Sequence, residues 1–373
     1  MRILVATDNY LPRWDGISRF LHEILPGLAR NFDISVIGPG FPGKSMGIRG
    51  VSAELLPTFG FHVGDYSPAK PSMRKIREMV EDCDVVFSQS LGPIGFFAVN
   101  YAKRYGKPLV CYVHSIEWEL FEKSIKLHRY AKSIVKHTTK SLARSLYNKA
   151  DLLLVPSKEI GSLLTKEGIR TKKHVVHLGI NTEEFRPSAK KADAKKKLSF
   201  GDDIIIGFTG RLGREKDLPT LYEAFDIISR VHDDVRLVIV GTGIEELGSR
   251  TNKRVIFTGN VDNVQDYLRA FDIFVMPSLT ETSSLATMEA MACALPVVST
   301  KVGYIRHYIR DGQNGFFFDF GDANGLARRL DMLIGSESLR RSIGKKARET
   351  IVRKYPWSKT MKELNMVFDG FRP

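Results

Sequence analysis

Residues 273–298 form the stretch that most restricts how this chain can fold. A short apolar run, Ile273–Met276, ends at a proline, a polar loop follows, and a second apolar run, Pro296–Val298, closes the stretch. Between these runs, apolar side chains recur at helical spacing, namely Leu285, Met288, Ala292 and Leu295. Because this spacing places them on one face of a helix, the stretch predicts strand, loop, helix and strand, the repeating unit of an α/β protein.

The same alternation recurs along both halves of the chain. Apolar runs predict strands at residues 3–6, 34–37, 84–88, 109–113, 151–156 and 175–176, then at 204–208, 236–240, 255–258, and one ending near 318. A chain of 373 residues is too long for one ordinary core, so we expect two Rossmann-like domains. The first is predicted at residues 1–187 together with a final helix at 358–373, and the second at 200–357, after a lysine-rich linker.

The composition indicates a folded chain with an anionic partner. Hydrophobic residues make up 43% of the chain, charged residues 26%, and the net charge is +14. This excess favours nucleotide phosphates or an acidic membrane surface, and nucleic acid is not expected, because no recognised nucleic-acid module accompanies the charge. No apolar run approaches the ~18 residues that would span a bilayer. The start of the chain turns acidic too early for a secretion signal, so we expect a cytoplasmic protein.

Two carboxylates lie in the stretch described first. Glu281 is in the loop and Glu289 is on the predicted helix, eight residues later. Carboxylates can bind sugar hydroxyls, and the free amides at the start of a helix can bind an anionic group, which suggests a site for a nucleotide sugar. The alternative is that the two acids only complement the helix dipole or face solvent.

The wider motif resembles a known one. The stretch resembles the donor motif of family 4 retaining glycosyltransferases, which have the GT-B fold. The similar features are Glu281 and Glu289 with seven residues between them, followed by Ala-Met-Ala-Cys and Pro-Val-Val. The resemblance implies two Rossmann-like domains facing across a cleft, with a C-terminal helix crossing back to the first. It implies that Glu281 contacts a hydroxyl of the transferred sugar and that Glu289 binds the ribose. Where most members have Phe-Gly, this chain has Ser283-Ser284, and Ala294 stands where they have glycine.

Other positions follow the family pattern. Arg211 and Lys216 come after a predicted strand and before a helix, where a diphosphate would bind, and the resemblance assigns both to the phosphates. It also assigns a histidine facing the donor sugar to His114, although a lone histidine is more often a packed or surface residue. The remaining predicted donor-binding residues are Gly16 near the diphosphate, Asn260 and Val261 at the nucleobase, and Ser283, Ser284 and Leu285 at the start of the helix.

A basic segment stands out in the first half. Between Lys123 and Lys149 there are eight basic residues and no acid, at a spacing that predicts a cationic stripe on one long helix with an apolar side. The residues expected to face an anionic membrane are Lys123, Lys126, Arg129, Lys132, Lys136 and Lys140, and those of the apolar side are Ile125, Ile134, Val135, Leu142, Leu146 and Tyr147. The alternative is a charged face that is only solvated.

The resemblance implies a retaining hexosyltransferase that uses a UDP- or GDP-hexose, with His114, Glu281, Arg211 and Lys216 as the catalytic set. We expect no metal cofactor, since the Asp82-Cys83-Asp84 motif precedes a strand, at the wrong end for a ligand site. The basic segment and the Glu-Thr opening of the motif, which is similar to that of members glycosylating diacylglycerol-type lipids, favour a membrane-lipid acceptor at the inner face of the membrane. A soluble saccharide acceptor and a nucleotide-sugar epimerase remain the alternatives.

Overall fold

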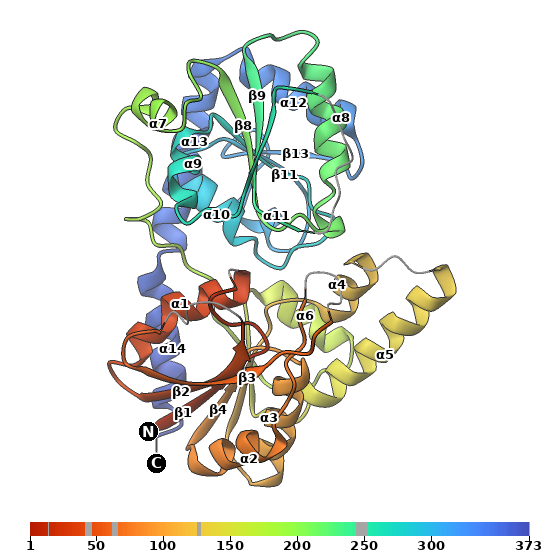
Figure 1. Cartoon of the computed structure of the whole chain (residues 1–373), viewed down its shortest axis with the longest axis vertical. Helices are drawn as coiled ribbons and strands as arrows, with labels where there is room; N and C mark the ends of the chain where they lie inside the picture. The colour runs from red at the N-terminus through yellow and green to blue at the C-terminus, as the bar shows by residue number, and fades with distance from the viewer. Residues whose placement is uncertain (14, 42–46, 62–65, 125–127, 244–251, 373) are drawn as a thin grey trace. The chain divides into compact units, whose positions relative to one another are not determined.

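The chain forms two compact units (Figure 1). The computed structural model describes residues 1–13, 15–41, 47–61, 66–124, 128–243 and 252–372. The first unit comprises Met1–Leu178 and Ser358–Pro373, and the second comprises Gly179–Trp357. Each unit is a parallel β-sheet with helices, which confirms the predicted fold class of two Rossmann-like domains.

The boundary between the units differs slightly from the predicted one. Residues 179–187 were expected at the end of the first domain, but they belong to the second unit. The Ile180 amide donates to the carbonyl of Tyr355 (2.8 Å), and the Trp357 amide donates to the carbonyl of Ile180 (3.2 Å). These bonds pair the segment with the end of the second unit.

The sheet of the first unit has the strand order β3-β2-β1-β4-β5-β6-β7. Its strands are β1 (Arg2–Ala6), β2 (Asp33–Gly40), β3 (Val51–Pro57), β4 (Val85–Ser88), β5 (Leu109–Tyr112), β6 (Leu152–Val155) and β7 (Lys173–Val175). Its helices are α1 (Gly16–Leu28), α2 (Met73–Asp82), α3 (Pro93–Arg104), α4 (Glu117–Ser124), α5 (Arg129–Tyr147), α6 (Lys158–Lys166) and α14 (Trp357–Asp369). Central strands such as β4 and β5 are buried along their whole length, which explains their uninterrupted apolar sequences.

The chain returns to the first unit through α14, whose apolar face packs on that unit's core (Figure 1). The Phe368 ring lies 5.0 Å from the ring of Phe87 and 6.0 Å from that of Phe32, both edge to face. A Cβ on Gly27 of α1 would lie 2.7 Å from the terminal methyl of Met361 in α14. The Pro26-Gly27 pair inside α1 therefore lies where this helix contacts Met361 of α14.

The sheet of the second unit has the strand order β10-β9-β8-β11-β12-β13. Its strands are β8 (Ile204–Thr209), β9 (Val235–Val240), β10 (Val255–Gly259), β11 (Ile273–Met276), β12 (Val297–Thr300) and β13 (Phe316–Phe318). Its helices are α7 (Lys191–Lys197), the short 3₁₀ helix η1 (Arg214–Lys216), α8 (Leu218–Ile228), α9 (Val264–Ala270), α10 (Leu285–Ala292), α11 (Ile305–Tyr308), α12 (Ala323–Ile334) and α13 (Glu337–Lys354).

This strand order determines which loops meet. All pairings in the second sheet are parallel, so the loops that follow β10, β9, β8 and β11 emerge side by side at one edge. The predicted donor-binding residues of this unit are on those loops or just beyond them. Among the helices within the described ranges, none is long and apolar enough to cross a bilayer.

Candidate functional site

Lys216 and Glu281 join two neighbouring loops of the second unit. Lys216 ends η1 in the loop after β8, and Glu281 lies in the loop after β11. Lys216 Nζ is 2.5 Å from Glu281 Oε1, and the two side chains are 15% and 11% exposed. Ser278 Oγ donates to the same carboxylate oxygen at 2.9 Å. Two of the predicted site residues, 65 positions apart, are therefore in direct contact.

Arg211 pairs with a carboxylate that the sequence prediction missed. Arg211 Nη2 lies 3.2 Å from Oε1 of Glu215, which is 4% exposed. The Glu215 carbonyl also accepts from the Leu279 amide (2.7 Å), which ties the Arg211 loop to the Glu281 loop. A carboxylate four residues after a conspicuous arginine is a signal that could have revealed this pair, but its burial could not be predicted.

The segment between Glu281 and α10 has an unusual backbone. Ser284, which precedes α10, has a φ of +57°, in the left-handed region that favours glycine. The glycine that the family resemblance implies at this position would adopt such a conformation without strain, and the Ser284 hydroxyl bonds with that of Thr287 at 2.8 Å. The Ser283 hydroxyl oxygen is buried and has no hydrogen-bond partner among the described residues, which leaves a polar group available at the site.

The loop from 281 to 284 is braced from behind by the segment after β12. The Tyr308 hydroxyl donates to the carbonyl of Ser283 (2.8 Å), and the Tyr304 amide donates to the carbonyl of Thr282 (2.8 Å). Gly303 has a φ of +48°, and a Cβ there would lie 1.8 Å from the carbonyl oxygen of Glu281. The position of the Glu281 backbone therefore depends on a glycine at 303.

Glu289 and the other predicted residues of α10 share one rigid element. Glu289 lies on the second turn and is 3% exposed, and Leu285 opens the helix and is half-buried. Burial, with Glu289 nearby as a second cause, raises the pKa of the Cys293 thiol to about 12. The structure thus places the second carboxylate of the motif inside the protein, where a free negative charge is costly.

The loops after β9 and β10 complete this edge of the sheet. Thr242 Oγ1 donates to Asn260 Oδ1 at 3.0 Å, which joins the two loops. A Cβ on Gly241 would lie 1.9 Å from the Gly210 carbonyl oxygen, so backbone packs directly on backbone between the loops after β8 and β9. Val261, the other predicted nucleobase contact, is half-buried beside Asn260.

In the first unit, His114 lies just beyond the carboxyl end of β5. Its ring stacks on Tyr112 (4.4 Å between centroids) and meets the edge of Phe20 (5.0 Å), and its Nε2 is 2.9 Å from Gln89 Oε1. Burial lowers the pKa of His114 to about 3, so the imidazole is neutral at physiological pH. It can offer hydrogen bonds but not a positive charge.

Gly16, predicted to face the donor, is the first residue of α1. The Asp15 carboxylate caps this helix by accepting from the amides of Ile17 and Ser18, both at 3.0 Å. Gly16 is exposed, and a Cβ there would meet no atom within 4 Å. The described part of the chain thus contains no contact that requires glycine at this position.

The basic segment differs from the prediction. It forms two helices, α4 and α5, instead of one, and two residues of the predicted apolar side, Ile134 and Leu142, are 64% and 45% exposed. Lys132 and Lys136 are half-buried, and Lys140 forms an ion pair with Glu167. Lys126 lies outside the described residues, as do the side chains of Lys123 and Arg129. Leu146 and Tyr147, also of the predicted apolar side, are buried.

The Asp-Cys-Asp motif has a structural partner. Arg2 lies 2.5 Å from Asp82 through its guanidinium, and its backbone amide donates to Asp84 Oδ2 at 2.7 Å. Both carboxylates are thus engaged at the amino ends of β1 and β4.

Comparisons with known proteins agree with this geometry. The model of Glycosyltransferase Family 4 matches residues 14–184, and that of Glycosyl transferases group 1 matches residues 189–350. Sulfoquinovosyl transferase SQD2 of Arabidopsis thaliana is 29% identical over 365 residues, covering 94% of this chain and 68% of that protein. Alpha-monoglucosyldiacylglycerol synthase of Acholeplasma laidlawii is 25% identical, covering 86% and 85%. The crystal structure of HepE of Anabaena in complex with UDP-glucose has the same fold, with a TM-score of 0.80, 18% identity and coverage of 99% and 100%.

Proposed function

The chain belongs to the family 4 glycosyltransferases of the GT-B fold, and from this premise we propose that it is a retaining hexosyltransferase that uses a nucleotide-sugar donor. The observation that carries the proposal is the contact between Lys216 and Glu281, together with the Arg211–Glu215 pair, whose loop is bonded to the Glu281 loop through the Leu279 amide. Two cations and a carboxylate at the loops after β8 and β11 suit a diphosphate and a sugar hydroxyl, respectively.

The hydrogen-bond capacity of this cluster supports binding of a donor without rearrangement of the pair. An ammonium group has three donors, and among the described residues only Glu281 accepts from that of Lys216, so two donors are left there for phosphate oxygens. Glu281 Oε1 accepts from both Lys216 and Ser278. Its second oxygen, Oε2, accepts no hydrogen bond within the described residues and is the candidate partner of a sugar hydroxyl.

We propose front-face substitution as the mechanism. The acceptor oxygen bonds to the anomeric carbon on the face from which the diphosphate departs, and the acceptor proton passes to the leaving phosphate oxygen. Arg211 and Lys216 stabilise the negative charge that develops on the diphosphate. The resemblance adds His114 and Glu281 as contacts of the sugar and Glu289 as the contact of the ribose.

A double displacement would need a carboxylate nucleophile instead. Asp8, at the end of β1, is a poor candidate. It is buried and accepts from the amides of Ile94 (2.8 Å) and Gly95 (3.1 Å) and from the hydroxyl of Ser90 (2.6 Å). The Asp8 carboxylate is therefore engaged in hydrogen bonds at the start of α3, which makes it a poor nucleophile.

For the acceptor we propose a membrane lipid of the diacylglycerol type. Exposed Ile134 and Leu142, with Lys132 and Lys136 on the same helix, suit a surface that rests among anionic headgroups. The similarity to alpha-monoglucosyldiacylglycerol synthase of Acholeplasma laidlawii supports the same class of acceptor. The enzyme would then act as a peripheral protein at the inner face of the membrane.

The test is turnover of radiolabelled UDP-glucose and GDP-mannose with diacylglycerol in anionic vesicles, with soluble saccharides offered in parallel. The expected product is a glycolipid whose anomeric configuration, read by NMR, equals that of the donor. Product on saccharides alone would reject the lipid acceptor, and isomerised sugar formed from donor and water alone would indicate an epimerase. If no nucleotide sugar is consumed or raises the melting temperature, the proposed function is wrong.

A further inference from the structure

A second cavity lies in the second unit, at the edge of the sheet opposite to the Lys216–Glu281 pair. It has a volume of about 1060 Å³, and all the residues that line it belong to the second unit. Asp272, Pro296 and Asn314 of its lining come shortly before β11, β12 and β13, respectively. Since the strands are parallel, the cavity is at their amino ends, whereas the candidate site is at their carboxyl ends. The two sites are therefore separate.

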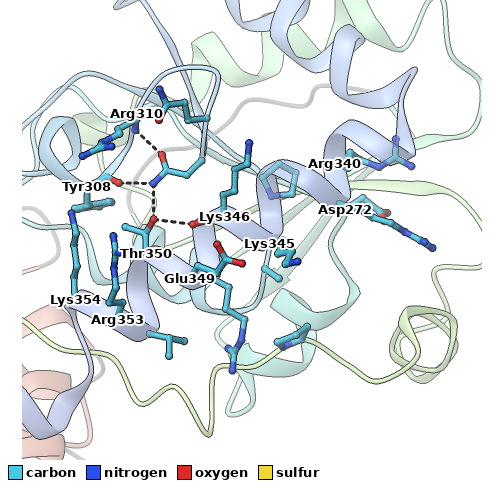
Figure 2. A pocket seen from close by; sticks show the side chains of 18 of the residues that line it. Asp272, Tyr308, Arg310, Arg340, Lys345, Lys346, Glu349, Thr350, Arg353 and Lys354 are labelled. Atoms are coloured by element: carbon cyan, nitrogen blue, oxygen red, sulfur yellow. Dashed lines mark hydrogen bonds between the residues drawn. The ribbon is translucent and has the colours of Figure 1, made fainter.

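The walls of this cavity are fixed to one another. One wall is α13, and the other is the segment from Tyr308 to Asn314 (Figure 2). The Asn314 side chain, 5% exposed, donates to the carbonyl of Tyr308 (2.8 Å) and to the hydroxyl of Thr350 on α13 (3.0 Å), and it accepts from the amide of Arg310 (2.6 Å). A buried amide that bonds both walls makes the cavity a built feature of the fold.

The lining carries nine lysine and arginine side chains and three carboxylates. Several of these cations have structural partners: Arg341 pairs with Glu337 (2.6 Å), Lys191 with Asp272 (3.5 Å), and Arg348 and Arg340 bond to backbone carbonyls. Four cations, in contrast, have no ion-pair partner anywhere in the described ranges, and all four are exposed: Arg310, Lys345, Lys346 and Lys354. Positive charges that lie close together in one cavity repel one another, and a bound anion reduces this repulsion.

The types of side chain indicate which anion this is. A guanidinium with several ammonium groups suits phosphate oxygens, which accept several charge-assisted hydrogen bonds at once. The aromatic lining residues are His307, which stacks on Tyr304 (5.3 Å between centroids), and Tyr308, which is buried with its hydroxyl bonded to the Ser283 carbonyl, so both rings are engaged within the protein. We propose that this cavity, which we call the α13 cavity, is a second binding site that takes phosphate groups, independent of the donor site.

Two sources could supply this chemistry, a phospholipid headgroup and a soluble phosphate. The probes are vesicles containing phosphatidylglycerol, with vesicles of phosphatidylcholine alone as blank, and sodium pyrophosphate and glycerol 3-phosphate in solution. Binding to the vesicles alone identifies the headgroup, and binding to a soluble probe identifies the free phosphate. Because α5 is proposed to bind anionic vesicles and the donor site to bind a diphosphate, only binding that depends on Lys345 and Lys346 supports the site, and the absence of such binding with every probe overturns it.

The test variant is Lys345→Ser with Lys346→Ser. Both side chains are exposed, so the fold should persist, and binding should weaken by at least about tenfold. The matched control is Arg230→Ser with Lys253→Ser, which removes the same charge from exposed positions of the same unit outside the cavity and should change binding by less than about twofold. If both double variants weaken binding equally, the loss comes from the lower net charge and not from the cavity, and the proposal is overturned. The variant Lys216→Ala should keep the binding that depends on Lys345 and Lys346, and loss of that binding would also overturn it.

Discussion

Lys216 Nζ lies 2.5 Å from Glu281 Oε1, and this pair connects the loop after β8 to the loop after β11. Both side chains are largely shielded from water, at 15% and 11% exposure, so neither charge is well solvated when its partner is removed. A loss of activity on mutating one partner could therefore come from lost chemistry or from a disturbed fold. The first prediction separates the two.

We predict that Lys216→Ala and Glu281→Ala each lower kcat/KM by at least about 100-fold. Each single variant should also lower the free energy of unfolding by about 1–3 kcal/mol, since it leaves an unpaired charge in a shielded place. The double variant should regain most of the stability, because no unpaired charge remains, but none of the activity. Urea unfolding and steady-state kinetics measure the two quantities. Activity that returns together with stability would show that the pair is only structural.

An exposed ion pair provides the control. Lys75 pairs with Glu54, and these side chains are 44% and 36% exposed. Lys75→Ala should change the free energy of unfolding by less than about 1 kcal/mol and leave kcat/KM unchanged.

The second prediction concerns Gly303, which supports the Glu281 loop from behind. An alanine Cβ at 303 would lie 1.8 Å from the Glu281 carbonyl oxygen, so the loop must shift. We expect Gly303→Ala to lower kcat/KM by at least about tenfold, because small displacements of positioned groups are costly in catalysis. Gly321→Ala is the matched control, since Gly321 also has a positive φ (+69°) but no neighbour within 4 Å of a Cβ. It should lose about 1 kcal/mol of stability and no activity, and equal activity losses would refute the bracing role.

The parts of this site that could be predicted are those that short stretches of sequence indicate by themselves. Strands β8 and β11 are short apolar runs, and Lys216 and Glu281 follow such runs within a few residues, so their meeting at one sheet edge follows from parallel topology. The role of Glu215 could not be predicted in this way. Its burial depends on the backbone bond to Leu279, 64 positions away, which no local pattern encodes.

Two misses have a similar cause. Strand β3 was not predicted because it is an edge strand of the first sheet in which only Leu56 is fully buried, so its sequence lacks an apolar run. The segment around α4 and α5 was predicted as one helix but forms two, and of its predicted apolar side Ile134 is 64% exposed whereas Leu146 is buried. Spacing along a helix shows which residues share a face, and it does not show what that face meets.

The third prediction uses this exposed part of α5. Ile134→Ser combined with Leu142→Ser should weaken binding to anionic vesicles by about tenfold, because it removes apolar side chains that would enter the bilayer interface. Stability should be nearly unchanged, since these side chains are 64% and 45% exposed. Val231→Ser, which replaces a side chain that is 72% exposed on the second unit, is the control and should bind vesicles like the wild type. Co-sedimentation measures the binding, and unchanged binding of the double variant would remove α5 from the membrane surface.

The fourth prediction concerns pH and Glu117, at the start of α4. Glu117 Oε1 accepts from the Tyr147 hydroxyl at 2.6 Å, and its Oε2 is buried without a hydrogen-bond partner in the part of the chain described. Burial raises the pKa of Glu117 to about 7, from an ordinary value of 4.5. In the folded protein this carboxyl therefore stays protonated at pH values where the unfolded chain has already released the proton.

The sign of the effect follows from this difference. The contribution of Glu117 to stability is fully present below pH 4.5 and is lost as the pH rises to about 7, by at most about 3 kcal/mol. Glu117→Gln keeps an acceptor for Tyr147 and cannot ionise. The free energy of unfolding of this variant, minus that of the wild type, should therefore increase from pH 4.5 to about 7 and stay constant above pH 7. His114 has the opposite pH dependence: because its pKa is lowered to about 3, the free energy of unfolding falls as the pH drops below 6.5. Both proteins contain His114, so subtracting their free energies of unfolding at each pH removes its contribution. A difference that stays flat from pH 4.5 to 7 would mean that the Glu117 carboxyl ionises as it does in the unfolded chain.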